Sequence, residues 1–211
     1  MNPPAVQLRT YTGEHAKVFI PELARLRITV FRDYPYLYDG SMDYEEQYLQ
    51  TYLQSSESIV VIASHNKQVV GASTATPMEH ETPNVIRPWT DKGYRPKDIF
   101  YFGESVLLQP YRGQGVGVGF FRHREQWAAS LGRFSLLAFC AVIRPDDHPL
   151  KPANYTSLES FWQRRGFKKA HDIVCNMSWK DLDQPQETQK QLQFWVKKCH
   201  TDPVIFKNHT Q

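Results

Sequence analysis

The sequence has few cysteines and no long hydrophobic run. Its three cysteines, Cys140, Cys175 and Cys199, lie far apart and form no CxxC pair. This spacing argues against a disulfide framework or a zinc site and favours a reducing compartment. No apolar segment approaches the roughly 20 residues that a membrane-spanning helix needs, and the N-terminal residues lack the basic start and apolar core of a secretory signal. We therefore expect a cytoplasmic protein without a membrane partner and without a bound metal.

The sequence also lacks a strong excess of charge of either sign. It has 25 basic and 22 acidic residues among 211, a net charge of +3, and the basic residues are spread along the chain. Nucleic acids and anionic membranes are bound by clustered positive charge, so neither is expected as a partner. The 41% of hydrophobic residues is ordinary for a globular protein. A chain of this length fits one sizeable domain.

The hydrophobic pattern predicts strands and helices in mixed order. β-Branched or apolar runs predict strands at 5–11, 58–64, 69–76, 100–108 and 134–143. Helical spacing and capping residues predict helices at 13–34, after Ser41 or Asp43, at 117–131 and at 157–165. Residues 77–99, with four prolines, are expected to form a long irregular loop. Residues 167–182 have strand character on both sides of a His-Asp pair. This order predicts a single α/β domain built on a mixed sheet.

Four glycines alternate with other residues at 113, 115, 117 and 119, between a predicted strand and a predicted helix. Glycine lets a ligand approach the main chain and a helix N-terminus favours an anion, so this loop predicts a phosphate site. The ATP-binding P-loop is excluded because no lysine or hydroxyl residue follows the glycines. The dinucleotide-binding spacing fails because Val118 stands where a third glycine is needed. A tight turn that packs the helix on the sheet is the alternative without a ligand.

The pattern that does fit is Arg-x-x-Gly-x-Gly, present as RGQGVG at 112–117. With the preceding VLLQPY, it resembles the acetyl-CoA-binding motif of the GNAT (Gcn5-related N-acetyltransferase) superfamily. The segment SLESFWQRRGF at 157–167 resembles a later segment of that family, an aromatic pair followed by three residues and Gly-Phe. The motifs cover 100–180, and the order of elements agrees over 5–180. The resemblance implies a mostly antiparallel central sheet with splayed central strands, flanked by helices.

The same resemblance implies acetyl-CoA as co-substrate. Main-chain groups of the glycine loop would bind its pyrophosphate, and strand 100–108 would pair with its pantetheine arm. The implied cofactor-binding residues are Val106, Leu107, Leu108, Arg112, Gly113, Gln114, Gly115, Val116, Gly117, Asn154 and Phe161. Three of these, Leu107, Leu108 and Phe161, also suit a hydrophobic core. Asn154 lies one residue away from the family's usual asparagine position, which Tyr155 occupies.

The implied reaction is direct transfer of an acetyl group to a primary amine in a ternary complex, without a covalent nucleophile. Glu104 is the implied catalytic base, with a structural carboxylate as the alternative and His148 as a weaker candidate base. Where many family members have a tyrosine acid, this sequence has Trp162, whose indole cannot deliver a proton. Tyr155 or water would take that role. A coenzyme A-binding module without catalysis, and a protein lysine or N-terminal acetyltransferase, remain alternatives.

Segment 31–48 has five tyrosines and five carboxylates, in the region that usually shapes the acceptor pocket of this superfamily. Such residues suit a cationic amine of a small molecule, and the expected substrate-binding residues are Asp33, Tyr34, Tyr36 and Asp39. Alternatively, the acidic residues favour a helix N-terminus and the tyrosines cover the sheet edge. Residues 1–183 are expected to form the acetyltransferase domain. Residues 184–211 are expected to form an amphipathic helix and tail that pack on the domain or on a second copy in a homodimer.

Overall fold

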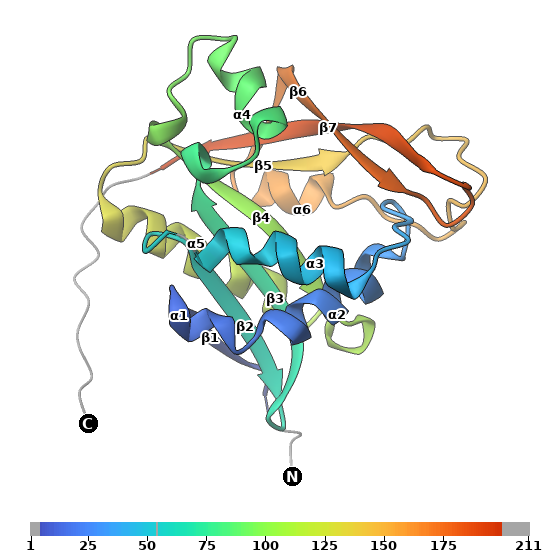
Figure 1. Ribbon diagram of the computed structural model, residues 1–211, viewed down its shortest axis with the longest axis horizontal. Coiled ribbons are helices and arrows are strands. Elements are labelled where there is room, and N and C mark those ends of the chain that lie inside the picture. Colours follow the sequence, from blue (N-terminus) through green and yellow to red (C-terminus); the bar gives the residue numbers. More distant parts are fainter. Residues whose placement is uncertain (1–4, 54, 200–211) are drawn as a thin grey trace.

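The computed structural model describes residues 5–53 and 55–199, which form a seven-stranded sheet with helices on both faces (Figure 1). The strand order is β1-β2-β3-β4-β5-β7-β6. The strands are β1 (Gln7–Tyr11), β2 (Ile59–His65), β3 (Gln68–Pro77), β4 (Ile99–Leu107), β5 (Leu136–Val142), β6 (Lys168–Lys180) and β7 (Glu187–Lys198). Neighbouring strands are antiparallel except β4 and β5, which are parallel. The predicted mixed, mostly antiparallel sheet is confirmed.

Helices α1 (Glu14–Lys17), α2 (Ile20–Phe31) and α3 (Met42–Leu49) cover one face of the sheet, and α5 (Val116–Leu131) and α6 (Glu159–Arg164) cover the other (Figure 1). Pro21 lies in the first turn of α2, where the missing N–H costs no hydrogen bond. Ser41 is the N-cap of α3, as predicted. Gly132 ends α5 with a φ of 68°, a conformation that favours glycine.

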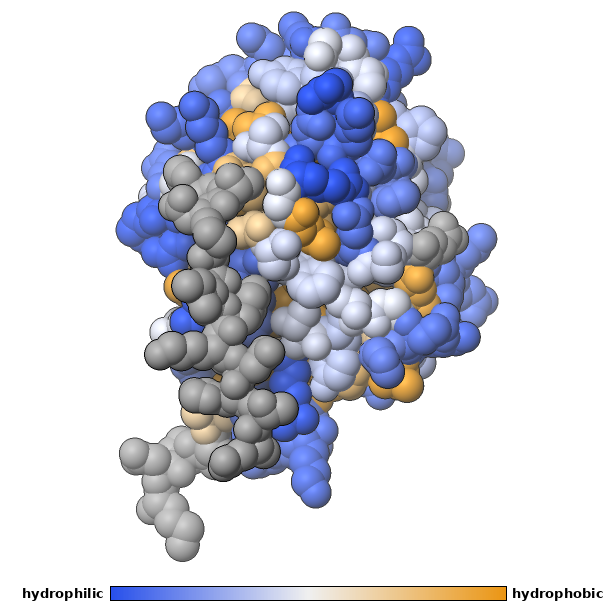
Figure 2. Space-filling model, turned by 90° about the vertical axis from the view of Figure 1, so that its left-hand side faces the viewer, coloured by the Kyte–Doolittle hydropathy of each residue, from blue (hydrophilic) through white to orange (hydrophobic). Residues whose placement is uncertain are grey.

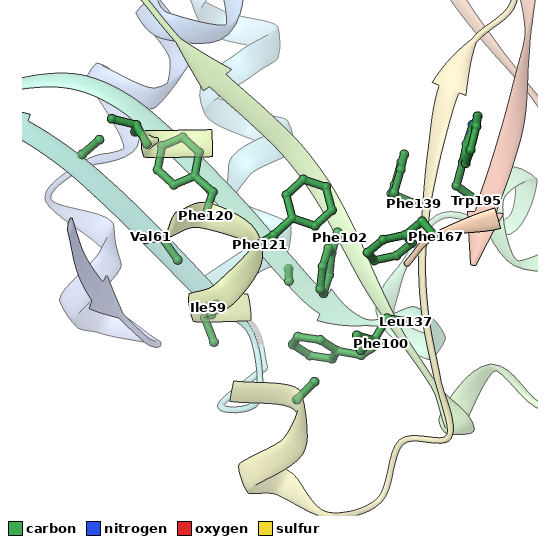
Figure 3. Close-up of a cluster of buried hydrophobic side chains, with 14 of the residues drawn as sticks. Ile59, Val61, Phe100, Phe102, Phe120, Phe121, Leu137, Phe139, Phe167 and Trp195 are labelled. Atoms are coloured by element: carbon green, nitrogen blue, oxygen red, sulfur yellow. The ribbon is translucent and has the colours of Figure 1, made fainter. Parts of the chain in front are cut away.

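An aromatic core joins α5 to the sheet. Figure 3 shows Phe121 of α5 beside Phe102 of β4, with Phe139 and Phe167 continuing the cluster toward Trp195 of β7. The rings of Phe102 and Phe121 lie 5.9 Å apart at 70°, an edge-to-face arrangement that aromatic pairs prefer. This packing fixes α5 against β4, and so positions the glycine loop that joins them.

Strands β4 and β5 pair only over their first residues. The pairs are Ile99 with Leu136, Phe100 with Leu137 and Tyr101 with Ala138. Beyond Tyr101, β4 pairs only with β3, and β5 only with β7. Figure 3 shows the two ribbons close together near Phe100 and Leu137 and diverging beyond them. The splay between the central strands, expected from the resemblance, is confirmed.

The predicted C-terminal helix is wrong, because these residues form strand β7 between β5 and β6. Leu192 and Phe194 pack in the core on the α4 side of the sheet, while Trp195 packs on the α5 side. Lys190, Leu192 and Phe194 are buried in alternation with more exposed glutamines, but the lysine hides this strand pattern in the sequence, and Trp195 is buried on the opposite face. Leu192, Trp195 and Val196 therefore imitate the spacing of a helix. The proposed boundary at residue 183 is therefore wrong too: 187–198 belong to the same sheet. Residues 200–211 of the predicted tail lie outside the described residues.

The predicted irregular loop at 77–99 contains a helix, α4 (Pro83–Thr90), between the 3-10 turns η2 (Met78–His80) and η3 (Pro96–Asp98). Val85 and Trp89 are buried at i, i+4 spacing, and Trp89 packs on Phe194 with ring centroids 5.1 Å apart. The prolines concealed this helix, although Pro83 lies in its first turn, where proline is tolerated. Strand β6 is continuous but shifts register between Lys169 and Val174, around the His-Asp pair.

The visible surface on one side of the molecule carries no large hydrophobic patch. On the side at the left of Figure 1, most residues are hydrophilic, and the hydrophobic ones form small separate groups (Figure 2). In the described part of the chain, every helix is too short or too polar to cross a lipid bilayer.

Candidate active site

The glycine loop leads into the N-terminus of α5. It follows a 3-10 turn, η4 (Gln109–Tyr111), and its Gly113 and Gly115 have φ values of 77° and 82°. These left-handed conformations favour glycine, although a Cβ at either position would meet no atom within 4 Å. No side chain caps α5, so its first N–H groups are directed at the exposed loop. This arrangement suits an anion.

Side chains of the loop fix its shape. Arg112 Nε donates to Leu107 O over 3.1 Å, and Gln114 Nε2 donates to Pro110 O over 2.9 Å. Val116 is buried in the core, so only its main chain is available to a ligand. Phe161 of α6 lies beside the loop, since its Cζ is 3.5 Å from where a Cβ of Gly117 would be. The structure thus brings these predicted cofactor-binding residues together, whereas the predicted Asn154 lies exposed in the loop before α6.

Only some residues of β4 have main-chain groups that face the splay, where the pantetheine arm is expected to bind. Leu108 N–H donates to Val70 O over 3.0 Å, so the main chain of Leu108 faces β3. Because main-chain directions alternate along an antiparallel strand, Val106 also faces β3, while Ser105 and Leu107 face the splay. Of the three predicted residues, only Leu107 therefore presents main-chain groups there. Sequence reasoning missed Ser105, because the register between β3 and β4 decides which residues of β4 point their N–H and C=O groups toward β3 and which point them away.

Glu104 lies at a β-bulge in β4. Ser73 pairs with Ser105 and Ala75 with Phe102, so Gly103 and Glu104 together face Thr74. Gly103 is required here, because a Cβ would lie 2.2 Å from Tyr52 Oη. The bulge lies just beyond the last residue that pairs with β5, and the Glu104 side chain is buried on the face covered by α2 and α3.

The carboxylate of Glu104 belongs to a buried cluster around Arg27. Arg27 Nη1 lies 2.6 Å from Glu104 Oε2, and Arg27 Nε donates to Glu45. The second carboxylate oxygen of both glutamates is buried without a hydrogen-bond partner among the described residues. Burial raises the pKa of Glu104, Arg27 opposes this rise and Glu45 adds to it. A buried carboxylate with a raised pKa and an unpartnered oxygen can accept a proton from a bound group.

Glu81, which the sequence analysis missed, is a third buried carboxylate of this region. It follows η2, and its Oε1 lies 3.4 Å from Tyr52 Oη. Burial raises the pKa of Glu81 to about 7, and the neighbouring Glu104 contributes to the rise. No sequence signal distinguishes Glu81 from the other acidic residues of 77–99, because its burial depends on how that segment folds over the sheet.

The predicted acceptor residues divide into two groups, the partly buried Tyr34 and Tyr36 and the exposed Asp33 and Asp39. Tyr34 contacts the predicted acid Tyr155, with ring centroids 4.7 Å apart, and also His148 at 5.8 Å. Burial raises the pKa of Tyr155, which keeps its hydroxyl protonated at neutral pH. Asp33 and Asp39 are exposed and bind basic side chains: Asp33 lies 3.5 Å from Arg112, and Asp39 Oδ2 lies 2.8 Å from Lys180.

No protein-family model matches this sequence, and no curated protein matches it. Solved structures do match the fold, over most of both chains. The ribosomal-protein-alanine N-acetyltransferase from Brucella melitensis matches with a TM-score of 0.59 and 15% identity, over 91% of this chain and 99% of that chain. A GNAT-family acetyltransferase from Streptococcus pneumoniae matches with a TM-score of 0.57 and 13% identity, over 93% and 100%. The acetyltransferase yncA from Salmonella typhimurium, solved with acetyl-CoA, matches at 0.58 and 10%, over 96% and 99%.

The fold is that of the GNAT acetyltransferases. At these identities the likeness establishes the GNAT fold and leaves activity and substrate to the residues of the site.

Trp162 departs from the GNAT pattern; it is partly buried and packs against the aromatic core. Its ring packs on Phe139 and on Trp195, each with a centroid distance of 5.1 Å. The side chain at the usual position of the GNAT acid therefore packs against strands β5 and β7. Tyr155, seven residues earlier in the sequence, is the alternative candidate for the acid.

Arg144 anchors the aromatic segment that follows α2 in this GNAT fold. It donates to Pro35 O and Tyr36 O, each over 2.7 Å, and pairs with the buried Asp181. Trp179 Nε1 adds a bond to Tyr36 O at 3.0 Å. Sequence reasoning missed Arg144 and Trp179, since the carbonyl oxygens of Pro35 and Tyr36 that they bind lie more than a hundred positions away. In the described ranges, no three His, Cys, Asp or Glu side chains are grouped to hold a metal ion.

Proposed function

We propose that this protein is an acetyl-CoA-dependent N-acetyltransferase that transfers an acetyl group directly to a primary amine of a small molecule. The observation that carries the proposal is the position of Glu104. It is a buried carboxylate with an unpartnered oxygen, on the strand that splays from β5 and leads into the glycine loop. A proton acceptor on β4 and a main-chain cradle that suits a phosphate-bearing cofactor thus lie on one short segment of the chain, 104–117.

The residues of the site fit acetyl-CoA. The glycine loop and the uncapped N-terminus of α5 suit its pyrophosphate, with Arg112 adding positive charge. Main-chain groups of Ser105 and Leu107 face the splay and suit the amides of its pantetheine arm, as an added strand would. Phe161 lies beside the loop and offers an apolar surface.

Acetyl-CoA, when bound, supplies the acetyl group in activated form as a thioester. Glu104 accepts the proton of the attacking amine, directly or through a water molecule. Ser105 N–H faces the splay and donates a hydrogen bond to the thioester carbonyl oxygen. Tyr155, held protonated by partial burial, donates a proton to the leaving thiolate.

The charge of the buried cluster supports a cationic acceptor. Glu45 and Glu104 are two carboxylates that pair with the single cation Arg27, and Glu81, with a pKa of about 7, adds a partial negative charge at neutral pH. The aromatic rings of Tyr34 and Tyr36 lie on the segment that follows α2 and suit an amine through cation–π contact. An amine-bearing molecule entering as an ammonium ion would balance this negative charge before it gives up its proton.

Two specific observations favour other functions. The Brucella melitensis neighbour is named for a protein acceptor, which supports a protein N-terminus as the alternative substrate. The packing of Trp162 against Phe139 and Trp195, at the usual position of the acid, supports a coenzyme A-binding module without catalysis.

The test combines acetyl-CoA binding by calorimetry with thiol release against a panel of free amines and of N-terminal peptides. We expect binding, turnover on a free amine, and a loss of about 10²- to 10⁴-fold in kcat/KM for Glu104→Gln, the usual contribution of a general base. Glu57→Gln, which alters a surface carboxylate paired with Arg133, is the control. Turnover on peptides alone would favour the protein acceptor, and binding without any turnover the non-catalytic module. Absence of acetyl-CoA binding contradicts the proposal.

A further inference from the structure

Arg124 of α5 is a buried cation beneath the bulge that carries Glu104. Its side chain is 1% exposed, and its guanidinium lies over the rings of Phe102 and Phe121, at 4.3 and 5.0 Å from their centroids. Burial lowers the pKa of Arg124 to about 9, which leaves it charged at neutral pH. A buried charge is costly unless it makes strong hydrogen bonds, so its partners indicate what it stabilises.

The partners of Arg124 are main-chain and hydroxyl oxygens on both strands at the bulge. Arg124 Nη1 lies 3.3 Å from Thr74 O on β3 and 3.4 Å from Glu104 O on β4. Its Nη2 donates to Ser105 Oγ over 2.8 Å, and its Nε lies 3.3 Å from Phe120 O of its own helix. One guanidinium therefore spans the place where the register of β3 and β4 shifts.

The bond to Glu104 O fixes the direction of the next N–H group. In a trans peptide the C=O and N–H point in opposite directions, so Ser105 N–H points away from the oxygen that Arg124 holds. The alternation along β4 places this N–H toward the splay, where the pairing with β5 has ended at Tyr101. Bulges re-aim main-chain and side-chain groups, and this one is secured from the face opposite the Glu104 side chain.

We propose that Arg124 is a positioning residue that aims Ser105 N–H into the splay, where it donates a hydrogen bond to the carbonyl of an acyl thioester. The inference rests on the proposed function. Arg124 touches neither co-substrate; it acts through the Glu104–Ser105 peptide. Lysine at this position would keep the charge but not the planar fork that reaches oxygens of two strands at once.

The test measures the carbonyl stretching frequency of ¹³C-labelled acetyl-CoA bound to the protein, by infrared difference spectroscopy. In the native protein we expect a lower frequency than in free acetyl-CoA, because a hydrogen bond weakens the C=O bond. Arg124→Lys and Arg124→Gln should lose most of this shift. Their kcat should fall by about ten- to a hundredfold, less than the loss of a whole donor, while the Kd for acetyl-CoA stays within about threefold, because the glycine loop is intact.

Arg144→Lys is the matched control: it alters another buried arginine that binds main-chain oxygens, those of Pro35 and Tyr36 rather than of β4, and should leave the carbonyl frequency unchanged. Native frequencies in folded Arg124 variants would overturn the inference. Should both variants fail to fold, the Ser105 amide proton of the native protein decides: a downfield NMR shift on acetyl-CoA binding supports the inference, and no shift overturns it. Failure of the native protein to bind acetyl-CoA overturns the proposed function instead.

Discussion

Arg27 and Glu104 form a buried ion pair between α2 and β4, with Nη1 2.6 Å from Oε2 and side chains 12% and 2% exposed. The same guanidinium binds Glu45 of α3, so one arginine joins two helices to the central strand. It also lies over the rings of Phe31 and Tyr48. Arg27 is therefore the close cation that opposes the rise in the pKa of Glu104 caused by burial and by Glu45.

Replacing Arg27 by Met should shift the acid limb of the pH profile of kcat/KM to higher pH. Arg27 opposes the burial that raises the pKa of Glu104, so its loss lets that pKa rise further, by about 1 to 3 units for a close opposite charge. Removing one partner of a buried pair should also lower the free energy of unfolding by about 3–5 kcal/mol. Activity is measured from pH 5 to 10, at a temperature where the variant is folded.

Arg144→Met is the control for Arg27→Met, since it breaks the comparably buried pair with Asp181. We expect it to destabilise the protein and to leave the acid limb in place. An Arg27 variant with a native pH profile would show that Glu104 is not the titrating base.

Replacing Gly115 by Ala should weaken acetyl-CoA binding. Both Gly115 and Gly132, at the two ends of α5, have left-handed φ values, and a Cβ at either meets no atom within 4 Å. Alanine should therefore cost about 1–2 kcal/mol of stability at both positions. Only at Gly115 does the strain fall on the loop that would hold the pyrophosphate, so we expect a rise in Kd of about tenfold or more there. Calorimetric titration checks this, and equal Kd values for the two variants would argue against the loop as the binding site.

The buried Glu81 should make the protein less stable as pH rises. Its pKa in the folded state is about 7, against 4.5 for an ordinary glutamate, so between these values the folded state binds more protons than the unfolded state. The free energy of unfolding should therefore fall from pH 4.5 to pH 7, by on the order of 3 kcal/mol at 1.36 kcal/mol per pKa unit. Glu81→Gln should remove most of this dependence.

Urea denaturation at pH 5, 6, 7 and 8 measures the effect of Glu81. Glu57→Gln is the control of opposite sign, because the hydrogen bond from Arg133 lowers the pKa of Glu57 and its contribution is lost as pH falls. A native protein whose free energy of unfolding stays constant or rises between pH 5 and 7 would contradict a buried, protonated Glu81.

Truncation after Asp183 should prevent folding. It removes β7, which pairs with β5 from Leu136–Lys198 to Val142–Leu192 and with β6 on its other side. The truncation also removes Phe194 from the core on the α4 side of the sheet and Trp195 from the core on the α5 side. Circular dichroism and thermal melting check this against a truncation after Cys199, which keeps every described strand and should fold. A fragment 1–183 that folds and melts cooperatively would show that the domain ends at residue 183, as expected from the sequence.

The sequence by itself determined the features that depend on short-range chemistry. Glycine spacing at 113–117 predicted the loop before α5, because the left-handed φ values of Gly113 and Gly115 favour glycine locally. The hairpin of β2 and β3, the helix start behind Ser41 and the helix end at Gly132 followed from propensity and capping in the same way.

Only the tertiary structure decided the features that depend on distant partners. Residues 187–198 form a strand because they pair with β5 and β6, and the buried Lys190 and Trp195 hide the alternation that marks a strand in sequence. The pairing with β3 decided that Ser105 and Leu107, not Val106, face the splay. The sites of Arg27, Glu81 and Arg124 likewise arise from contacts between residues 18 to 77 positions apart. Local pattern carries no record of such pairs, because burial and hydrogen bonding are set only when the sheet and its helices pack together.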